Sequence, residues 1–401
     1  MLGFKGPGAE LLREEDGGKG LMLKVKHAMS PTLLGPGLDS MNEKMIKLLK
    51  SSVDELAACQ NKPVDIFAWC RHAITTASTY ASFGPLNPLA DKKVEEALWT
   101  FEQNLVWVFV KIFPGKSIQA RELLVRAFEE YFQAGGHEDS SDLTLARWKV
   151  QRDAGASVND IARLEISECI AILTNTVPIT FWMVFDIYSR PILLRGIRKE
   201  LHEHALRFDG NKCTIDLTDI REKCALLLST FQEVLRLRSK ASPIRTGTKD
   251  VMLNDRYLIK AGSILQMPGP FLGRKEETWG ERANEFDPSR FMKGNAENDK
   301  NSAKRVSSFL AFGTVPNMCP GRHFASGEVL AVVAMLVLMY DLMPENGEWR
   351  EPRVSEMAMA SSIDSPTRGF NVKVNEREEF RDTEWDFRVT PGKGRFGLIT
   401  G

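Results

Sequence analysis

Residues 309–325 read FLAFGTVPNMCPGRHFA, and this stretch decides the fold. Its one cysteine, Cys319, lies in a loop rich in glycine and proline, and an apolar helix is expected to follow over about 326–342. Backbone N–H groups of such a loop, together with the positive end of the helix, favour a thiolate. Gly321 lets the backbone approach a ligand without a Cβ in the way. The loop can therefore present a strong metal ligand to a large, flat, apolar group. The competing interpretation is a core cysteine before a core helix.

The order of residues in this loop resembles the haem-binding loop of the cytochrome P450 family. The residues that carry the resemblance are Phe312-Gly313, Cys319-Pro320-Gly321-Arg322 and Ala325. In that family the cysteine thiolate is the axial ligand of the haem iron, and its electron donation favours O–O cleavage. The resemblance therefore implies Cys319 as the iron ligand, with Phe312 and Gly321 against the cofactor. The wording CPGRHFA is typical of fungal natural-product members of the family.

Two positions of the loop depart from the family pattern. Val315 stands where the family usually has glycine, and a β-branched residue at such a position predicts a strained loop. Asn317 stands where the family usually has Arg or His, so it can hydrogen-bond a haem propionate but carries no charge. Both departures predict a lower affinity for haem, but they do not change the family resemblance.

Composition limits the class of protein. With 43% hydrophobic residues among 401, the chain can bury one large core, although its length alone would allow about two or three domains. A formal net charge of +0 does not indicate a nucleic-acid-binding surface. The six cysteines form no CxxC pair and are expected to be reduced thiols of a cytosol-facing protein. The spacing of His202 and His204 puts the two rings on different faces of a helix, which does not favour a metal site.

The longest predicted helix covers about 157–188, with Ser157 as its N-cap and Pro178 expected to kink it. Its centre resembles the oxygen-side helix of the same family. Thr176 matches the threonine that positions dioxygen and a proton-bearing water, and Asn175 stands where many relatives have an acid. The wording around them is close to the sterol- and prostanoid-handling branch. The resemblance also makes Ala171 and Ile179 candidates for lining a substrate pocket. The alternative for Thr176 is a hydroxyl bonded to its own helix backbone.

A buried ionic triad is the second specific prediction. Glu233 and Arg236, spaced i and i+3, share one helix face, but this pattern alone is a weak signal. The stretch 286–291, FDPSRF, resembles the second arginine motif of the family. The resemblance implies that Glu233 lies between Arg236 and Arg290 and that this network holds the cysteine loop in place.

The segment between these motifs is expected to be rich in β-strands, with strands over 251–253, 256–259 and 263–267. Arg245 matches the arginine that binds a haem propionate in relatives, and Pro243 and Ile244 would border the substrate. A turn over 357–362 resembles a substrate-lining segment.

The first twenty residues are glycine-rich and charged, so they are not expected to form a secretory signal. No stretch reaches the roughly 18–20 apolar residues that a membrane span needs. The helix expected over 21–30, ended by Pro31, resembles the family helix at the haem edge. There Lys26 falls where relatives place a propionate-binding arginine; a solvated lysine face is the alternative. In this register the anchor, first helix and first strands of relatives would be missing.

The expected fold class is mainly α with a smaller β portion, as one N-terminally truncated haem-thiolate domain of the P450 fold. The predicted parts are a flexible start (1–20), a helical portion (21–240), a β-rich segment (241–300), the haem loop with its helix (309–342) and C-terminal strands (357–401).

The function implied by the resemblance is a haem-thiolate monooxygenase of secondary metabolism that oxidises a lipophilic small molecule. Its cofactors would be haem b and dioxygen, with electrons from NADPH through a separate P450 reductase, because no flavin or nicotinamide fingerprint is present. The protein is expected to be a monomer that binds no nucleic acid. Relatives act at the cytosolic side of the endoplasmic reticulum membrane, whereas this chain, without an anchor, would be cytoplasmic if Met1 is the true start.

Two alternatives stay open at this point. A haem-thiolate isomerase or dehydratase would need no external electrons, and Asn175 together with the prostanoid-like wording motivates it. A degenerate, non-catalytic haem binder is motivated by the early start, Val315 and Asn317. Its strands after Arg245 would leave an exposed sheet edge.

Overall fold

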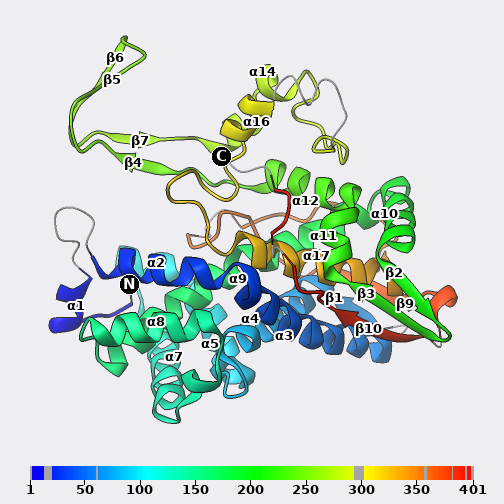
Figure 1. The fold of residues 1–401 in the computed structure, drawn as a ribbon, viewed down its shortest axis with the longest axis horizontal. Coiled ribbons are helices and arrows are strands. Elements are labelled where there is room, and N and C mark those ends of the chain that lie inside the picture. The colour runs from blue at the N-terminus through cyan, green and yellow to red at the C-terminus, as the bar shows by residue number, and fades with distance from the viewer. Residues whose placement is uncertain are drawn as a thin grey trace. The chain divides into compact units, whose positions relative to one another are not determined.

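The structure is a computed structural model that describes residues 2–12, 20–59, 62–292, 302–355, 359–381, 383–392 and 395–398. The sequence predictions that concern residues 13–19, 293–301 and 356–358 fall outside these ranges. Helices dominate and the strands form four small sheets, which confirms the mainly α class with a smaller β portion (Figure 1).

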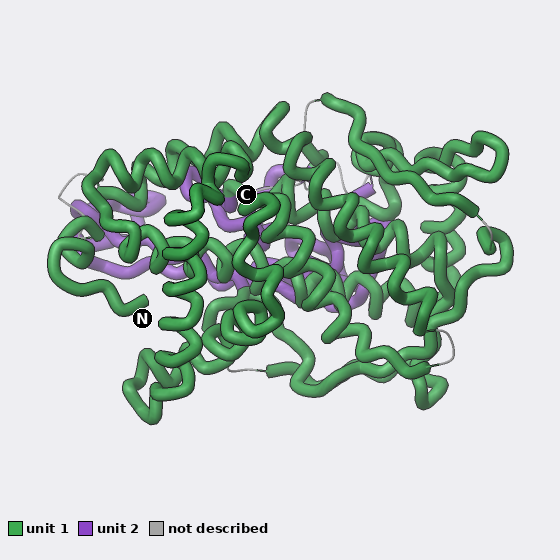
Figure 2. The backbone as a smooth tube through the Cα atoms, turned by 90° about the horizontal axis from the view of Figure 1, so that it is seen from below, with its two compact units in different colours: residues 1–228, 320–397 green, residues 229–319, 398–401 purple. Residues whose placement is uncertain are grey.

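The chain divides into two compact units (Figure 2). Unit 1 contains Met1–Leu228 and Pro320–Gly397, and unit 2 contains Ser229–Cys319 and Leu398–Gly401. Helix α12 begins in unit 1 and continues in unit 2. The organisation into a single haem domain stays a prediction.

Unit 1 is predominantly helical. Its α-helices are α1 (Pro7–Leu11), α2 (Leu21–Thr32), α3 (Gly35–Asp54), α4 (Ile66–Phe83), α5 (Lys92–Gln103), α6 (Leu105–Val110), α7 (Gly115–Gln133), α8 (Asp142–Asp153), α9 (Val158–Tyr188), α10 (Pro191–His204), α11 (Leu217–Lys223) and α17 (Arg322–Met339). Its 3-10 helices are η1 (Glu55–Cys59), η2 (Pro88–Ala90), η3 (Gly136–Asp139) and η4 (Glu378–Phe380).

Two three-stranded sheets complete unit 1. One has the order β1 (Pro63–Asp65), β9 (Asn371–Glu376), β8 (Tyr340–Pro344), with antiparallel pairing throughout. The other has the order β10 (Glu384–Arg388), β3 (Lys212–Asp216), β2 (Leu206–Asp209), in which β10 runs parallel to β3. Within the portion predicted to be helical (21–240), residues 206–216 form a hairpin instead, and Gly210, with φ of +58°, lies in its turn.

Helix α9 confirms the predicted long helix. Ser157 caps it, because its hydroxyl accepts from the Asp160 N–H at 3.1 Å while the Asp160 carboxylate accepts from the Ser157 N–H at 3.2 Å. The helix continues through Pro178 to Tyr188, so the proline does not end it. Pro31 likewise lies inside α2, although it was expected to end that helix at Ser30.

Helix α17 follows Cys319 in sequence and is buried along almost its whole length. The last carbonyls of any helix lack partners within the helix. Here side chains supply them: Tyr188 donates to the carbonyl of residue 336 at 2.8 Å, Arg198 to that of residue 337 at 2.9 Å and Arg377 to that of residue 338 at 2.9 Å. Donors from α9, α10 and the segment after β9 thus fix the C-terminal end of α17.

Two described helices, α9 and α17, are apolar and long enough to cross a membrane by composition alone, contrary to the sequence expectation that no such stretch exists. Within the fold, 78% and 89% of their apolar windows are buried, as in core helices of a globular protein.

Unit 2 carries short helices and two hairpins. Its elements are α12 (Ala225–Arg238, shared with unit 1), β4 (Ile244–Thr246), β5 (Val251–Leu253), β6 (Tyr257–Ile259), β7 (Ile264–Gln266), α13 (Gly269–Leu272), α14 (Glu276–Trp279) and α16 (Ser302–Ser308). The strands predicted over 251–267 are confirmed, with β4 paired to β7 and β5 to β6 in one continuous two-stranded ribbon (Figure 1).

Candidate functional site

The loop that ends at Cys319 is closed by backbone hydrogen bonds within unit 2. The Cys319 N–H donates to the carbonyl of Phe312 at 2.8 Å, and the Gly313 N–H donates to that of Leu310 at 2.9 Å. Gly313 has a φ of +79°, a conformation that favours glycine. The backbone therefore folds back so that Cys319 and Phe312, which the sequence placed at the same site, are adjacent.

Cys319 differs from most other cysteines of the chain in its exposure. It is exposed, whereas Cys70, Cys169, Cys213 and Cys224 are buried, and none of them is in a disulfide. The interpretation of Cys319 as a buried core cysteine does not match this exposed position.

The expected strain at Val315 is not found. Val315 has no positive φ, and its side chain is 68% exposed, so the loop accommodates the β-branched residue without crowding. The peptide bond between Val315 and Pro316 is cis.

Arg245 joins strand β4 to the cysteine loop. Its Nη2 donates to Thr314 Oγ1 at 2.7 Å and to the Thr314 carbonyl at 3.2 Å. The strand pairing of β4 with β7 fixes the backbone of Arg245, and the loop fixes its guanidinium. The neighbouring Pro243 is half-buried and Ile244 is 57% exposed.

The predicted triad is present in unit 2. Arg236 forms a bidentate ion pair with Glu233, in which both N–O distances are 2.7 Å. Arg290 Nε donates to Oε1 of the same carboxylate at 3.2 Å. The side chains of Glu233, Arg236 and Arg290 are 0%, 0% and 6% exposed. One buried carboxylate therefore pairs with two buried guanidinium groups.

The triad also satisfies backbone groups around it, which explains how a buried ionic group can be tolerated. Arg236 donates to the carbonyls of Gly273 and Ala283, each at 2.6 Å, and Arg290 donates to that of Trp279 at 2.8 Å. Removal of one arginine would leave several buried acceptors without a donor.

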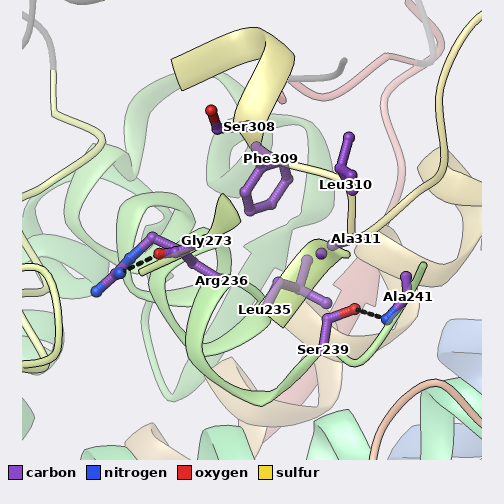
Figure 3. Close-up of a pocket in the computed structure, with 10 residues that line it drawn as sticks. Leu235, Arg236, Ser239, Ala241, Gly273, Ser308, Phe309, Leu310 and Ala311 are labelled. Carbon is purple, nitrogen blue, oxygen red and sulfur yellow. Dashed lines mark hydrogen bonds between the residues drawn. The ribbon is translucent and has the colours of Figure 1, made fainter. Parts of the chain in front are cut away.

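The end of α12 faces the segment that leads into the cysteine loop (Figure 3). Arg236 and Ser239 line one side of a cavity of about 10 Å³, and residues 308–311 line the other. Such a volume holds roughly one water molecule. The triad helix and the stretch before Cys319 are therefore packed closely against each other.

The residues predicted for the oxygen side lie on α9 in unit 1. The Thr176 hydroxyl donates to the carbonyl of Ile172 at 2.7 Å, which is the backbone-bonded state named as the alternative. Asn175 Oδ1 accepts from the Ser362 N–H at 2.7 Å. The side chain of Asn175 therefore ties the centre of α9 to the turn that was predicted to line the substrate.

The remaining candidates of unit 1 differ in exposure. Ile179 is 3% exposed, Ala171 is exposed and Lys26 on α2 is half-buried. Thr174, in the same stretch of α9, donates to the carbonyl of Ala360 at 3.2 Å as well as to its own helix. The site residues thus fall in both units, and each set is arranged within its own unit.

Residues around the cysteine fit a flat cofactor with an iron centre. Gly321 has a φ of −80°, which any residue can adopt, and no described atom lies within 4 Å of a Cβ placed there. Contacts within the chain therefore give no reason for glycine at this position, whereas a flat group against the loop would. The residues present suit haem: the exposed thiol of Cys319 can ligate iron, the ring of Phe312 can pack on a flat group, and the guanidinium of Arg245 can pair with a carboxylate. No group of three or more His, Cys, Asp or Glu among the described residues could hold a separate metal ion.

Sequence reasoning missed two polar contacts of α17. Glu328 is 0% exposed and accepts from Ser78 Oγ at 2.6 Å, and His323 Nδ1 accepts from the Phe396 N–H at 3.2 Å. A glutamate inside an apolar helical run was a signal for the first contact. The second joins residues far apart in the chain, and no local pattern marks it.

Comparisons with known proteins identify a family and several relatives. The sequence model of the family described as Cytochrome P450 matches residues 22–368. The chain is 44% identical over 410 residues to the cytochrome P450 monooxygenase nodJ of Hypoxylon pulicicidum, covering 100% of this chain and 79% of that protein. It is 27% identical over 337 residues to a cytochrome P450 monooxygenase of Gibberella zeae, covering 80% of this chain and 64% of that protein. It is 30% identical over 182 residues to the monooxygenase calL of Penicillium decumbens, covering 44% and 33% of the two chains.

Proposed function

The chain belongs to the cytochrome P450 family, as a monooxygenase of the fungal natural-product type, and on this premise we propose that it oxidises a lipophilic secondary metabolite. The observation that supports this most is the exposed Cys319 on a loop that is closed by its own bond to the Phe312 carbonyl and contacted by Arg245 at Thr314. Haem, when bound by Cys319, supplies the activation of dioxygen for insertion of one oxygen atom into a C–H bond.

Residues in and next to the cysteine loop would hold the cofactor. Cys319 would provide the thiolate, Phe312 would pack against the ring, Gly321 would leave room for it and Arg245 would pair with a propionate. Lys26 of unit 1 is our proposal for a second propionate partner. The triad of Glu233, Arg236 and Arg290 keeps the loop in the required shape without touching the reacting groups; this role is supported by its packing against residues 308–311.

Residues of α9 would handle the proton and the substrate. The Thr176 hydroxyl, now bonded to the carbonyl of Ile172, would turn to hold a water that delivers a proton. Asn175 cannot relay a proton as an acid does, and its bond to Ser362 supports a positioning role. The apolar side chains of Ala171 and Ile179 on α9 would favour a lipophilic substrate. Pro243 and Ile244 of unit 2 are separate candidates for contact with it.

The proposed electron source is NADPH through a separate reductase, and the proposed organisation is one haem domain that acts as a monomer. We place the protein at the cytosolic side of the endoplasmic reticulum membrane. Support comes from α6 and the residues after it, where Trp107, Phe109 and Phe113 are 39%, 65% and 93% exposed.

The ligand role of Cys319 is tested by the absorption spectrum of the reduced, carbon-monoxide-bound protein. The wild type is expected to show the band of thiolate-ligated haem, and Cys319→Ser to lose it. Cys213→Ser, at a buried thiol of unit 1, is the matched control and should keep the band. A thiolate band that survives in Cys319→Ser would refute the proposal.

The role of Thr176 is tested by coupling, the ratio of product formed to NADPH consumed with a reductase present. Thr176→Ala should lower this ratio, because the hydroxyl no longer positions the proton-bearing water. Thr180→Ala is the control, since Thr180 makes the same type of bond, to the carbonyl of residue 176 at 2.8 Å, one turn later. Unchanged coupling in Thr176→Ala would remove it from the mechanism.

A second candidate is a haem-thiolate isomerase or dehydratase that uses no external electrons. It is favoured by one observation: the Thr176 hydroxyl and the Asn175 amide oxygen are both engaged in bonds within the fold. Turnover of a peroxide substrate without NADPH or reductase would decide for this candidate, and strict dependence on both would decide against it.

A further inference from the structure

The C-terminal strap, defined as residues 384–392 and 395–397, lies beyond residue 368, where the match to the family model ends. It begins as strand β10, which pairs in parallel with β3 over five residues, 384–388. Trp385 and Phe387 of β10 are 9% and 7% exposed. The strap is therefore part of the core of unit 1.

After β10 the strap is fixed to α11 and to the residues just before it. The Thr390 N–H donates to Asp216 Oδ1 at 3.1 Å, and its hydroxyl donates to Asp216 Oδ2 at 2.5 Å. The Thr218 hydroxyl donates to the carbonyl of Thr390 at 2.7 Å. Burial would raise the pKa of Asp216, but bonds from Thr390 and Thr218 and the charge of Arg388 outweigh it and lower the pKa. The carboxylate is thus an ionised anchor for the strap.

The strap then reaches α3 and the first turns of α17. The Gly392 N–H donates to Asp39 Oδ2 at 3.1 Å. The Phe396 N–H donates to His323 Nδ1 at 3.2 Å, and its ring, 4% exposed, lies 3.5 Å from where a Cβ on Gly327 would be. Because Gly327 has no side chain, the ring packs directly on the helix backbone.

His323 is suited to accept this bond. Burial, together with the nearby charges of Arg322, Arg395 and Arg221, lowers the pKa of His323 to about 4. The ring is therefore neutral near pH 7, and Nδ1 can act as acceptor while Nε2 carries the proton. No side chain caps the N-terminus of α17. The strap supplies one contact at this end of the helix.

We propose that the C-terminal strap positions the first turns of α17 through Phe396 and His323, and thereby the cysteine loop, which joins that helix through Pro320 and Gly321. The inference rests on the proposed function, because it assigns both residues an indirect role in thiolate ligation of haem. Phe396 and His323 are positioning residues.

The test compares variants by the share of bound haem that shows the thiolate band in the reduced, carbon-monoxide-bound state. Phe396→Ala should lose part of this band, because the first turns of α17 lose their packing partner. Phe387→Ala is the matched control: it removes a phenylalanine of similar burial from the part of the same strap that pairs with β3, and it should keep the wild-type share. The spectra are recorded well below the unfolding temperatures of both variants, so that a lost band does not reflect unfolded protein. Equal shares in the two variants would overturn the inference.

A second pair of variants tests the hydrogen bond. In His323→Asn the amide oxygen can replace Nδ1 as acceptor, whereas His323→Leu has no acceptor. We expect the asparagine variant to retain the thiolate band and the leucine variant to lose part of it; equal behaviour would exclude the hydrogen bond as the connection. If Phe396→Ala does not fold, Phe396→Val removes the ring but keeps a smaller apolar side chain, and it should lose part of the band for the same reason.

The failure of this inference and of the proposed function can be told apart. Cys319→Ser reports on the ligand itself: a band that survives this change refutes the function, whatever the strap does. A band that Cys319→Ser abolishes, but that Phe396→Ala and Phe387→Ala affect equally, refutes only the role of the strap.

Discussion

Glu328 carries a carboxyl group that is buried within α17 and accepts a hydrogen bond from one hydroxyl. Ser78 donates to its Oε1, while Oε2 is buried without a hydrogen bond among the described residues. Burial, only partly offset by the Ser78 bond, raises the pKa of Glu328 from 4.5 to about 8. The folded protein therefore holds a proton there that the unfolded chain releases above its ordinary pKa.

This carboxyl makes stability depend on pH in a defined window. Between pH 4.5 and about 8 the folded state binds one more proton than the unfolded state, so the free energy of unfolding falls as pH rises, and the loss levels off above the folded pKa. The slope is about 1.4 kcal/mol per pH unit at most. We expect Glu328→Gln to flatten this dependence, measured by chemical denaturation at several pH values. The exposed Glu96→Gln is the control, and a wild-type curve that Glu328→Gln leaves unchanged would contradict the prediction.

At the scale of elements, α17 is fixed at both ends by residues distant in sequence. Tyr188, Arg198 and Arg377 supply donors to its last carbonyls, and Phe396 packs on its first turns. Helix α12 is fixed in the same manner by the ionic triad. In each case the helix position is set by tertiary contacts, as expected because propensity alone stabilises isolated helices only marginally.

The triad gives the prediction at this scale. Arg290→Ala should lower the free energy of unfolding by about 3–5 kcal/mol, because Glu233 and several carbonyls lose a buried donor. The expected result is protein with little bound haem, measured by haem content after purification. Arg282→Ala removes an exposed guanidinium nearby, and it should bind haem normally. Normal haem content in Arg290→Ala would contradict the structural role of the triad.

At the scale of the whole molecule, apolar residues at and beyond α6 are the feature that bears on location in the cell. Phe109, Val110, Ile112 and Phe113 are between 46% and 93% exposed. Phe113 adopts a φ of +43°, which directs the chain into a tight turn at this place. Exposed apolar residues gathered in this way are typical of a contact with a membrane or another apolar surface.

We therefore expect the purified protein to co-sediment with phospholipid vesicles, and the variant Trp107→Ser, Phe109→Ser, Phe113→Ser to bind them less. A control variant, Ile192→Ser with Phe208→Ser, removes two exposed apolar side chains elsewhere in unit 1. Equal vesicle binding by wild type and the triple variant would show that this surface does not contact the membrane.

The residues that the sequence predicted best are those whose chemistry is local or marked by a motif. Glu233, Arg236 and Arg290 came together as expected, because buried charges must be paired and the spacing of the motifs allowed it. Ser157 capped α9 because capping depends on only a few neighbouring residues. The packing of these groups against the cysteine loop followed from the same motifs.

Other features depended on contacts that no local pattern records. The bond from Ser362 to Asn175 joins residues 187 positions apart, and that from Phe396 to His323 joins residues 73 apart. Pro31 was expected to end α2, yet a proline near the last turn loses few backbone bonds, so the helix included it. Local sequence patterns predicted most helices and strands, whereas the helix ends and the long-range contacts depend on tertiary packing.

Cys319 is exposed whereas most other thiols of the chain are buried, so its chemical labelling can measure the fraction of protein that has bound the cofactor. Burial raises the pKa of Cys70, Cys169 and Cys224, so these sulfurs are poor nucleophiles toward alkylating reagents. With the half-exposed Cys59 replaced by serine, a maleimide should label apoprotein chiefly at Cys319, and haem should block that labelling. Mass spectrometry of the tagged peptide would then count the loaded fraction without reference to colour or turnover.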